Sequence, residues 1–176
     1  MRIAPGKECN YCESAKIQKH CKCVGRKGEE EMDYDCHEAL KLENQLCFPL
    51  YAAARDVIAR YTPFLKPLGI TYTQYLVFLV LWEKDGIPVG EICEKLRLDN
   101  GTLSPLLKKM QLQGFIEKRR SEKDDRIVVV SLTAKGKDLF EEAKDIPLKM
   151  AGCIKFPPDK AKQLYDLLYE LLDLRA

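Results

Sequence analysis

The cysteines of this chain carry its most reactive side chains, and one of them has a tyrosine close by in the sequence. Cys47 lies in an apolar segment, and Tyr51 follows four residues later, one turn away on the same face if the segment is helical. Only the thiolate reacts well with peroxides, and a tyrosine hydroxyl that donates a hydrogen bond to sulfur favours the thiolate. The pair therefore indicates a thiol open to oxidation. The alternative is a buried, inert core cysteine, which is the commoner fate of a single helical cysteine.

A second group of cysteines lies near the N-terminus in two closely spaced pairs. Its members are Cys9, Cys12, Cys21 and Cys23. Four thiolates so close in the sequence suit a tetrahedral zinc ion, and His20 is able to replace one of them. Because the second pair has Cys-x-Cys spacing, a flexible thiol-rich tail and an iron–sulfur cluster stay open as alternatives. We expect that no cofactor is required, and zinc is the metal that this pattern suggests.

Composition limits where these thiols act and what they bind. The 176 residues hold 29 Lys and Arg against 27 Asp and Glu, a net charge of +2, so any nucleic-acid binding must come from a local basic surface. No apolar run approaches the roughly 18 residues of a membrane span, and no secretory segment is visible. We therefore expect a cytoplasmic protein, in which a static disulfide framework would be rare.

The elements that must position the reactive residues are mainly helical from residue 36 onward. A first helix carries apolar residues at three- and four-residue spacing from Leu46 to Tyr61, and Pro63 and Pro67 with Gly69 are expected to end it. Asn100 is the expected N-cap of the fourth helix and Thr133 that of the fifth. After the first helix we expect helices at 72–84, 90–96 and 102–112, strands at 115–119 and 127–132, a helix at 134–143 or beyond, and a last helix from 157–158.

Helix–turn–helix followed by a charged hairpin predicts the fold class. It is mainly α with a small β-hairpin, a winged helix–turn–helix with dimerisation helices at both ends. The fourth helix buries Leu103, Leu106, Leu107 and Met110 by its periodicity. Its opposite face presents Thr102, Ser104, Pro105, Lys108 and Lys109. Short hydroxyl side chains suit base edges or phosphates, and lysines suit phosphates, so this face is a candidate DNA-binding surface.

The hairpin adds cations to that candidate surface. They are Lys118, Arg119, Arg120, Lys123 and Arg126. An arginine at a hairpin tip suits the narrow, negative minor groove, and we expect Asp124 to orient the guanidinium of Arg126. The alternative for each charge is an ordinary solvated side chain. Because one DNA-binding module buries little surface, we expect a homodimer on a pseudo-palindromic operator. The first and last helices carry more apolar surface than the core requires, which favours packing against a second copy; the alternative is that this surface is buried within one chain.

The recognition region resembles a known family. Segments 98–110, 114–116 and 124–126 resemble the MarR family of transcriptional regulators. Segment 42–51, together with Tyr61 and segment 70–75, is similar to its organic hydroperoxide resistance branch. The resemblance covers roughly residues 36 to 175. It implies an N-terminal extension at 1–35 and a winged-helix domain at 36–176. The domain would have dimerisation helices at 36–72 and 134–176 and a DNA-binding lobe at 73–133.

The resemblance also implies roles for particular side chains. Cys47 would be the peroxide sensor, and Tyr51, Tyr61 and Tyr72 would donate hydrogen bonds to its thiolate. Cys153 would be the resolving thiol of a two-cysteine type. Five residues depart from the family pattern: Thr73, Cys93, Arg97, Asn100 and Ser104.

The spacing of the tyrosines adds a constraint on the site. Tyr61 is fourteen residues beyond Cys47, roughly 21 Å along a straight helix, so it must reach the sulfur from a dimer partner or after a chain reversal. Oxidation of Cys47 would give a sulfenic acid and then a disulfide with Cys153. Because a disulfide requires the two Cα atoms to lie within about 7 Å of each other, forming it would strain the dimer. The expected function is a repressor released from its operator by organic hydroperoxide. The alternatives are a repressor that responds to a small phenolic ligand or a metal, and a thiol peroxidase. We expect no enzymatic activity, because the two histidines, His20 and His37, both lie outside the predicted core and no Cys–His pair is evident.

Overall fold

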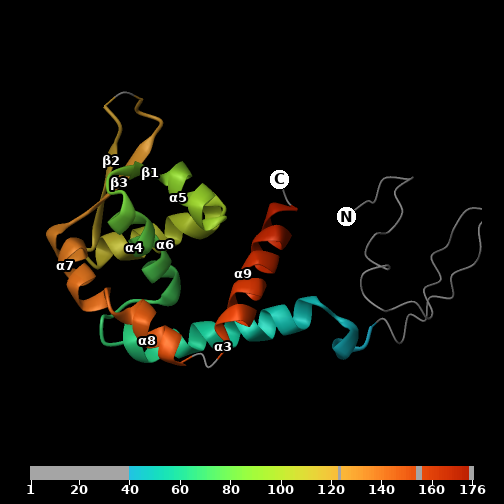
Figure 1. Cartoon of the computed structure of the whole chain (residues 1–176). Coiled ribbons are helices and arrows are strands. Elements are labelled where there is room, and N and C mark those ends of the chain that lie inside the picture. Colours follow the sequence, from blue (N-terminus) through green and yellow to red (C-terminus); the bar gives the residue numbers. More distant parts are fainter. Residues whose placement is uncertain (1–39, 123, 154–155, 175–176) are drawn as a thin grey trace, which may run out of the picture. The chain divides into compact units, whose positions relative to one another are not determined.

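The computed structural model describes residues 40–122, 124–153 and 156–174 (Figure 1). The chain divides into two compact units. The first unit ends at Asp56 and the second begins at Val57. In the first, the described part contains the 3₁₀ turn η1 (Leu42–Asn44) and the beginning of helix α3 (Cys47–Leu65). None of the helices in the described ranges is both long and apolar enough to cross a membrane.

Helix α3 begins at Cys47, later than the helical pattern predicted from residue 36, and it ends at Leu65, within the predicted stop formed by Pro63, Pro67 and Gly69. Pro63 lies inside its last turn. Pro63 costs the helix one hydrogen bond, the one that its missing N–H would donate to the Ala59 carbonyl, and the buried Leu65 anchors the final turn, so the helix continues past the proline. The chain turns back at Gly69, whose φ of +67° suits glycine, and the Ile70 N–H donates to the Leu65 carbonyl at 3.3 Å.

Helix α4 (Tyr72–Glu83) is the central helix of the second unit. Thr71 and Gln74 form a capping box, in which the Thr71 N–H donates to Gln74 Oε1 at 2.9 Å, so the expected start is confirmed. The helix buries residues on most of its circumference: Gln74, Tyr75, Val77, Phe78, Val80 and Leu81. An almost wholly apolar helix of this kind belongs in a core, and the other elements pack around it.

Helices α5 (Val89–Leu96) and α6 (Asn100–Leu112) form the helix–turn–helix. The expected cap was wrong by one residue, because Asp99 rather than Asn100 is the N-cap of α6. Its carboxylate accepts the Thr102 N–H at 2.8 Å, and these hydrogen bonds from Thr102 hold the pKa of Asp99 below its ordinary value. Aspartate and asparagine cap equally well, so composition alone did not distinguish them.

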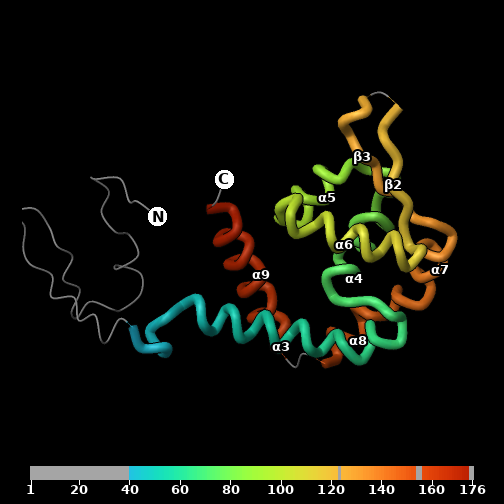
Figure 2. Tube along the Cα trace, turned by 180° about the vertical axis from the view of Figure 1, so that it is seen from behind, coloured from blue at the N-terminus to red at the C-terminus, as the bar shows by residue number. Residues whose placement is uncertain are grey.

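A three-stranded antiparallel sheet, with strand order β1-β3-β2, forms the wing. Strands β2 (Ile116–Arg120) and β3 (Val128–Leu132) pair in a register that places Arg120 opposite Val128. This hairpin projects from the second unit beyond α5 and α6 (Figure 2). Strand β1 (Ile87–Pro88) was not expected, since two residues that include a proline give almost no pattern.

Three helices complete the second unit. They are α7 (Ala134–Ala143), α8 (Ile146–Cys153) and α9 (Pro158–Asp173). The Thr133 hydroxyl accepts the Gly136 N–H at 3.2 Å, which confirms the expected cap of α7. Helix α9 has no buried residue among those described, although it is rich in leucine. Its large apolar side chains are exposed: Leu164, Tyr165, Leu167, Tyr169, Leu171 and Leu172.

Candidate functional site

The outward face of α6 is the candidate base-reading surface. Leu103, Leu107 and Met110 are fully buried beneath it, and Leu106 is half-buried, as the periodicity predicted. The side chains predicted for the opposite face are all exposed: Thr102, Ser104, Pro105, Lys108 and Lys109. The structure therefore presents the predicted set on one helix face, hydroxyls at its N-terminal end and lysines further along.

The Thr102 hydroxyl has a set direction. Its Oγ1 donates to Asp99 Oδ2 at 2.9 Å, so the hydroxyl hydrogen is engaged and its lone pairs are the part offered to a ligand. Ser104 lines an open surface pocket of about 530 Å³ that Asn100, Lys118 and Arg126 also line. This pocket joins the start of α6 to the wing, so a phosphate group lying there would meet two cations and a hydroxyl.

The wing arginines are exposed, and their hydrogen bonds differ from those predicted. Arg119 donates through Nη2 to both carboxylate oxygens of Glu117, at 2.9 and 3.0 Å. Asp124 Oδ1 accepts the backbone N–H of Arg126 at 2.9 Å; the expectation that it orients the Arg126 guanidinium was wrong. A carboxylate two residues back is well placed for the backbone of a turn, because an Asx turn closes there. Lys123 lies outside the described residues.

Arg120 closes the same turn from the strand side. Its Nη1 donates to the Asp125 carbonyl at 2.9 Å, and the Ser121 N–H donates to the Ile127 carbonyl at 2.8 Å. Arg120 thus stiffens the hairpin tip, whereas the Arg126 side chain remains exposed at that tip. Among the predicted wing cations that the structure describes, Arg126 has the geometry best suited to enter a minor groove.

The predicted sensor tyrosines of the second unit meet in a cluster. The ring centroids of Tyr61, on α3, and Tyr72, at the start of α4, are 4.8 Å apart. Tyr75, which was not predicted, completes the cluster at 5.9 Å from Tyr61, and its position three residues after Tyr72 was the available signal. Burial, and then the neighbouring Tyr61, raise the pKa of Tyr72 and of Tyr75 above the ordinary value. Both hydroxyls are therefore protonated donors at neutral pH.

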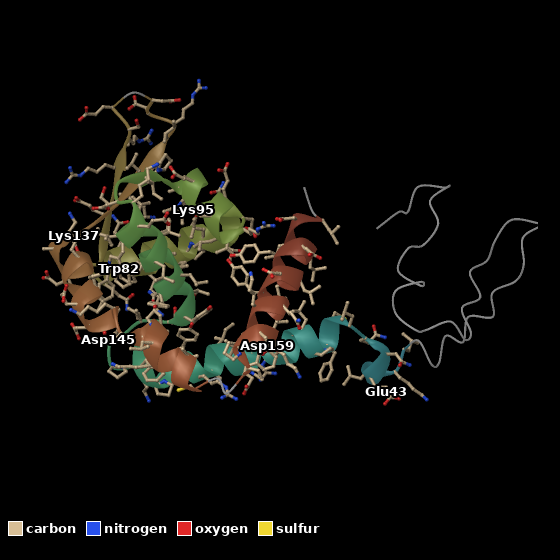
Figure 3. All side chains as sticks on the ribbon, viewed as in Figure 1. Glu43, Trp82, Lys95, Lys137, Asp145 and Asp159 are labelled. Atoms are coloured by element: carbon tan, nitrogen blue, oxygen red, sulfur yellow. The ribbon has the colours of Figure 1, made fainter. Side chains whose placement is uncertain are left out.

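The tyrosine cluster is continuous with the aromatic core of the second unit. Tyr75 makes an edge contact with Trp82 at 6.3 Å between centroids. Trp82, labelled in Figure 3, is on α4, and its ring contacts Phe140 of α7 at 5.6 Å. The Trp82 Nε1 donates to the Gly136 carbonyl at 3.1 Å, which holds α7 against α4. Phe78 links Trp82 to Phe115 at the foot of the wing. Packed rings thus connect Tyr61 with the DNA-binding elements.

The predicted sensor and resolving thiols are both exposed. Cys47 is the first residue of α3 and lies in the first unit with Tyr51, whose ring stacks beneath the Arg55 guanidinium at 5.5 Å. Cys153 is the last residue of α8, and its carbonyl accepts a hydrogen bond from Arg60 Nη1 at 3.0 Å. That bond ties the end of α8 to the part of α3 that carries the tyrosine cluster.

The predicted metal site is outside this structure. Cys9, Cys12, Cys21 and Cys23 lie outside the described residues. Within the described ranges, no group of three histidine, cysteine or acidic side chains is arranged to hold a metal ion.

Comparison with known proteins decides the family. Residues 59–143 match the model described as "Transcriptional regulator SarA/Rot". The organic hydroperoxide resistance transcriptional regulator of Bacillus subtilis is 49% identical over 134 residues, which cover 76% of this chain and 91% of that protein. The chain belongs to the MarR family of winged-helix transcriptional regulators. The predicted winged-helix fold is thereby confirmed, and the match to the Bacillus relative extends over most of this MarR-family regulator.

Solved structures agree with this assignment. Reduced AbfR bound to DNA aligns with a TM-score of 0.66 and 33% identity, over 80% of this chain and 97% of that one. Disulfide-formed AbfR aligns with a TM-score of 0.56 and 33% identity, over 77% of this chain and 96% of that one. AbfR is a protein of Staphylococcus epidermidis. Both forms of AbfR thus have the fold of this MarR-family chain.

Proposed function

We propose that this redox-sensing, DNA-binding regulator is a cytoplasmic repressor that leaves its operator when an organic hydroperoxide oxidises Cys47. The observation that carries the proposal is the tyrosine cluster, in which the rings of Tyr61 and Tyr72 contact each other at 4.8 Å and burial raises the pKa of Tyr72. The Bacillus relative is a regulator of organic hydroperoxide resistance, and AbfR has been solved both reduced on DNA and as a disulfide.

The cluster and the sensor thiol belong to two different copies in this proposal. Cys47 and Tyr61 are fourteen residues apart on the same helix, a rise of about 21 Å, so Tyr61 does not reach the sulfur of its own chain. In the homodimer, the tyrosine cluster of one subunit receives Cys47 of the other, and Tyr51 adds a donor from the sensor's own helix. The exposed apolar side chains of α3, among them Phe48 and Leu50, become the seam.

The chemistry is stoichiometric rather than catalytic. The Cys47 thiolate attacks the outer oxygen of the hydroperoxide, so an S–O bond forms while the O–O bond breaks. The alkoxide takes up a proton and leaves as an alcohol, and sulfur is oxidised to a sulfenic acid. The thiol of Cys153 then displaces hydroxide from that sulfur, giving a disulfide and water. Regeneration needs a cellular dithiol, which is oxidised in turn.

Disulfide formation would weaken binding to the operator by changing the arrangement of the two subunits. Cys153 is held next to the tyrosine-bearing part of α3 by the Arg60 hydrogen bond, so the partner's Cys47 and the resolving thiol approach the same region. Bringing their Cα atoms within about 7 Å moves one subunit against the other. The two α6 helices then lose the spacing of the operator half-sites.

DNA binding itself is assigned to α6 and the wing. Thr102 and Ser104 face base edges, Lys108 and Lys109 face phosphates, and Arg126 enters the minor groove. Arg119, Arg120, Lys123 and Asp124 complete the wing, the aspartate through the backbone of the turn.

A gel-shift titration on the protein's own promoter tests the proposal. We expect reduced protein to bind, organic hydroperoxide to release it, and dithiothreitol to restore binding. Cys47→Ser should bind and ignore peroxide. Cys93→Ser is the matched control, because its hydroxyl can still donate to Asn100 Oδ1, which Cys93 Sγ contacts at 3.3 Å; it should respond like wild type. Normal release of Cys47→Ser by hydroperoxide, or release by aromatic acids alone, would refute the proposed sensor.

A further inference from the structure

Arg97 joins the helix–turn–helix to the C-terminal helix through its guanidinium. Nη1 donates to the Leu172 carbonyl at 2.6 Å, and Nη2 donates to Asp173 Oδ1 at 2.9 Å. Leu172 and Asp173 form the end of α9, and all three residues belong to the second unit. We refer to this pair of hydrogen bonds as the Arg97 bridge. It connects two elements that are 75 residues apart in the sequence.

The backbone of Arg97 is also unusual. It is the C-cap of α5, with φ 53° and ψ 39°, and among the described residues it is the only non-glycine with a positive φ. Glycine is the usual residue in this left-handed conformation because it has no Cβ to crowd the following carbonyl, and asparagine is tolerated because its short polar side chain hydrogen-bonds locally. A long side chain at such a position carries a steric cost, so the bridge is a reason for an arginine to be there.

The end of α9 is complementary to a guanidinium. The last carbonyl groups of a helix have no intrahelical donor and carry the negative end of the helix dipole, and Asp173 adds a full negative charge. The side chains of Arg97 and Asp173 are 48% and 69% exposed, so the ion pair adds little to global stability. Its consequence is therefore geometric: it holds one helix end at one place on the other element.

The Arg97 bridge connects the helix proposed for dimer formation with the helix proposed for DNA binding. Helix α9 exposes leucine and tyrosine side chains, which we expect a second copy to cover together with α3 in the proposed dimer. Arg97 lies just before the turn that leads into α6. We propose that Arg97 is a positioning residue that fixes α6 relative to the dimer-forming α9 and so sets the separation of operator half-sites that the dimer accepts. This inference rests on the proposed function, which supplies the dimer and the operator.

Operators with altered spacing test this role. One base pair of added spacer moves a half-site by about 3.4 Å and turns it by roughly 35°. We expect the wild type to prefer one spacing sharply, in anisotropy titrations on duplexes that differ by single base pairs. Arg97→Asn and Asp173→Asn should bind the preferred duplex about three- to tenfold more weakly and the neighbouring spacings unchanged, so that selectivity is lost. Asparagine keeps the left-handed backbone, which separates the bridge from the cap.

A second measurement does not depend on DNA. The Leu174 N–H donates to the Glu170 carbonyl at the last turn of α9. Because the bridge holds this end of the helix, amide hydrogen exchange in the turn should be faster in Arg97→Asn than in wild type. The control is Asp166→Asn, which removes the exposed Lys162 pair from the same helix and should change neither readout.

The outcomes separate the two proposals. Loss of affinity by the same factor at every spacing, unchanged exchange in α9, or the same effects from Asp166→Asn would each overturn the Arg97 bridge as a positioning device. If the wild type binds no duplex, the proposed function fails, and the exchange measurement still decides whether the bridge forms.

Discussion

Replacing Tyr72 by phenylalanine tests the sensor chemistry most directly. The substitution keeps the ring that contacts Tyr61 at 4.8 Å and removes only the hydroxyl. A hydrogen bond to a charged group contributes about 1.5–3 kcal/mol, which is roughly a 10- to 150-fold change in the thiolate fraction. Because a less stabilised thiolate is a somewhat better nucleophile, we expect the oxidation rate constant at pH 7 to fall by about tenfold, the lower part of that range.

The assay is stopped-flow oxidation by cumene hydroperoxide, with the sulfenic acid trapped by dimedone, in protein carrying Cys153→Ser so that no disulfide forms. Burial raises the pKa of Tyr72 above its ordinary value of 10.0, so the hydroxyl keeps its proton at all lower pH values. The Tyr72 hydroxyl therefore stays a donor between pH 6 and 9, and the deficit of Tyr72→Phe should shrink as pH rises, because alkali favours the thiolate in both proteins. Tyr75→Phe, from the same cluster, is the control. An undiminished rate for Tyr72→Phe, or a pH-independent deficit, would contradict the proposed donor.

Three further predictions concern the rest of the chain. Gly136→Ala should lower the free energy of unfolding by about 1–3 kcal/mol in urea melts, since a Cβ there would clash with the Phe115 carbonyl; unchanged stability would contradict that packing. The pKa of Asp99 is lowered by its cap, so the stabilisation that Asp99 gives over Asp99→Ala should be present above about pH 4 and decline below it. A difference that grew on acidification would count against the cap. Metal analysis of chelator-free protein should find one zinc per chain bound by the cysteines of 1–35, and a metal-free preparation would end that proposal.

The recognition surface was visible in the sequence because it is a local property. The period of Leu103, Leu107 and Met110 determines which face of α6 is buried, and the exposed face follows without knowledge of any other element. The caps at Thr71 and Thr133 are likewise decided within three residues. The wing cations were predicted for the same reason, as charges within and between two β-rich segments.

Tertiary structure decided the contacts that join distant segments. Nothing local indicates that Tyr61 meets Tyr72 and Tyr75, or that Arg97 bonds to Leu172, because such pairings depend on how helices pack across a shared core. The two-residue strand β1 exists only because β3 offers it a partner, and Asp124 serves the backbone of a turn whose geometry the composition did not specify. Hydrogen bonds within one helical turn are determined by sequence spacing, whereas those between elements are determined by the packing that brings the elements together.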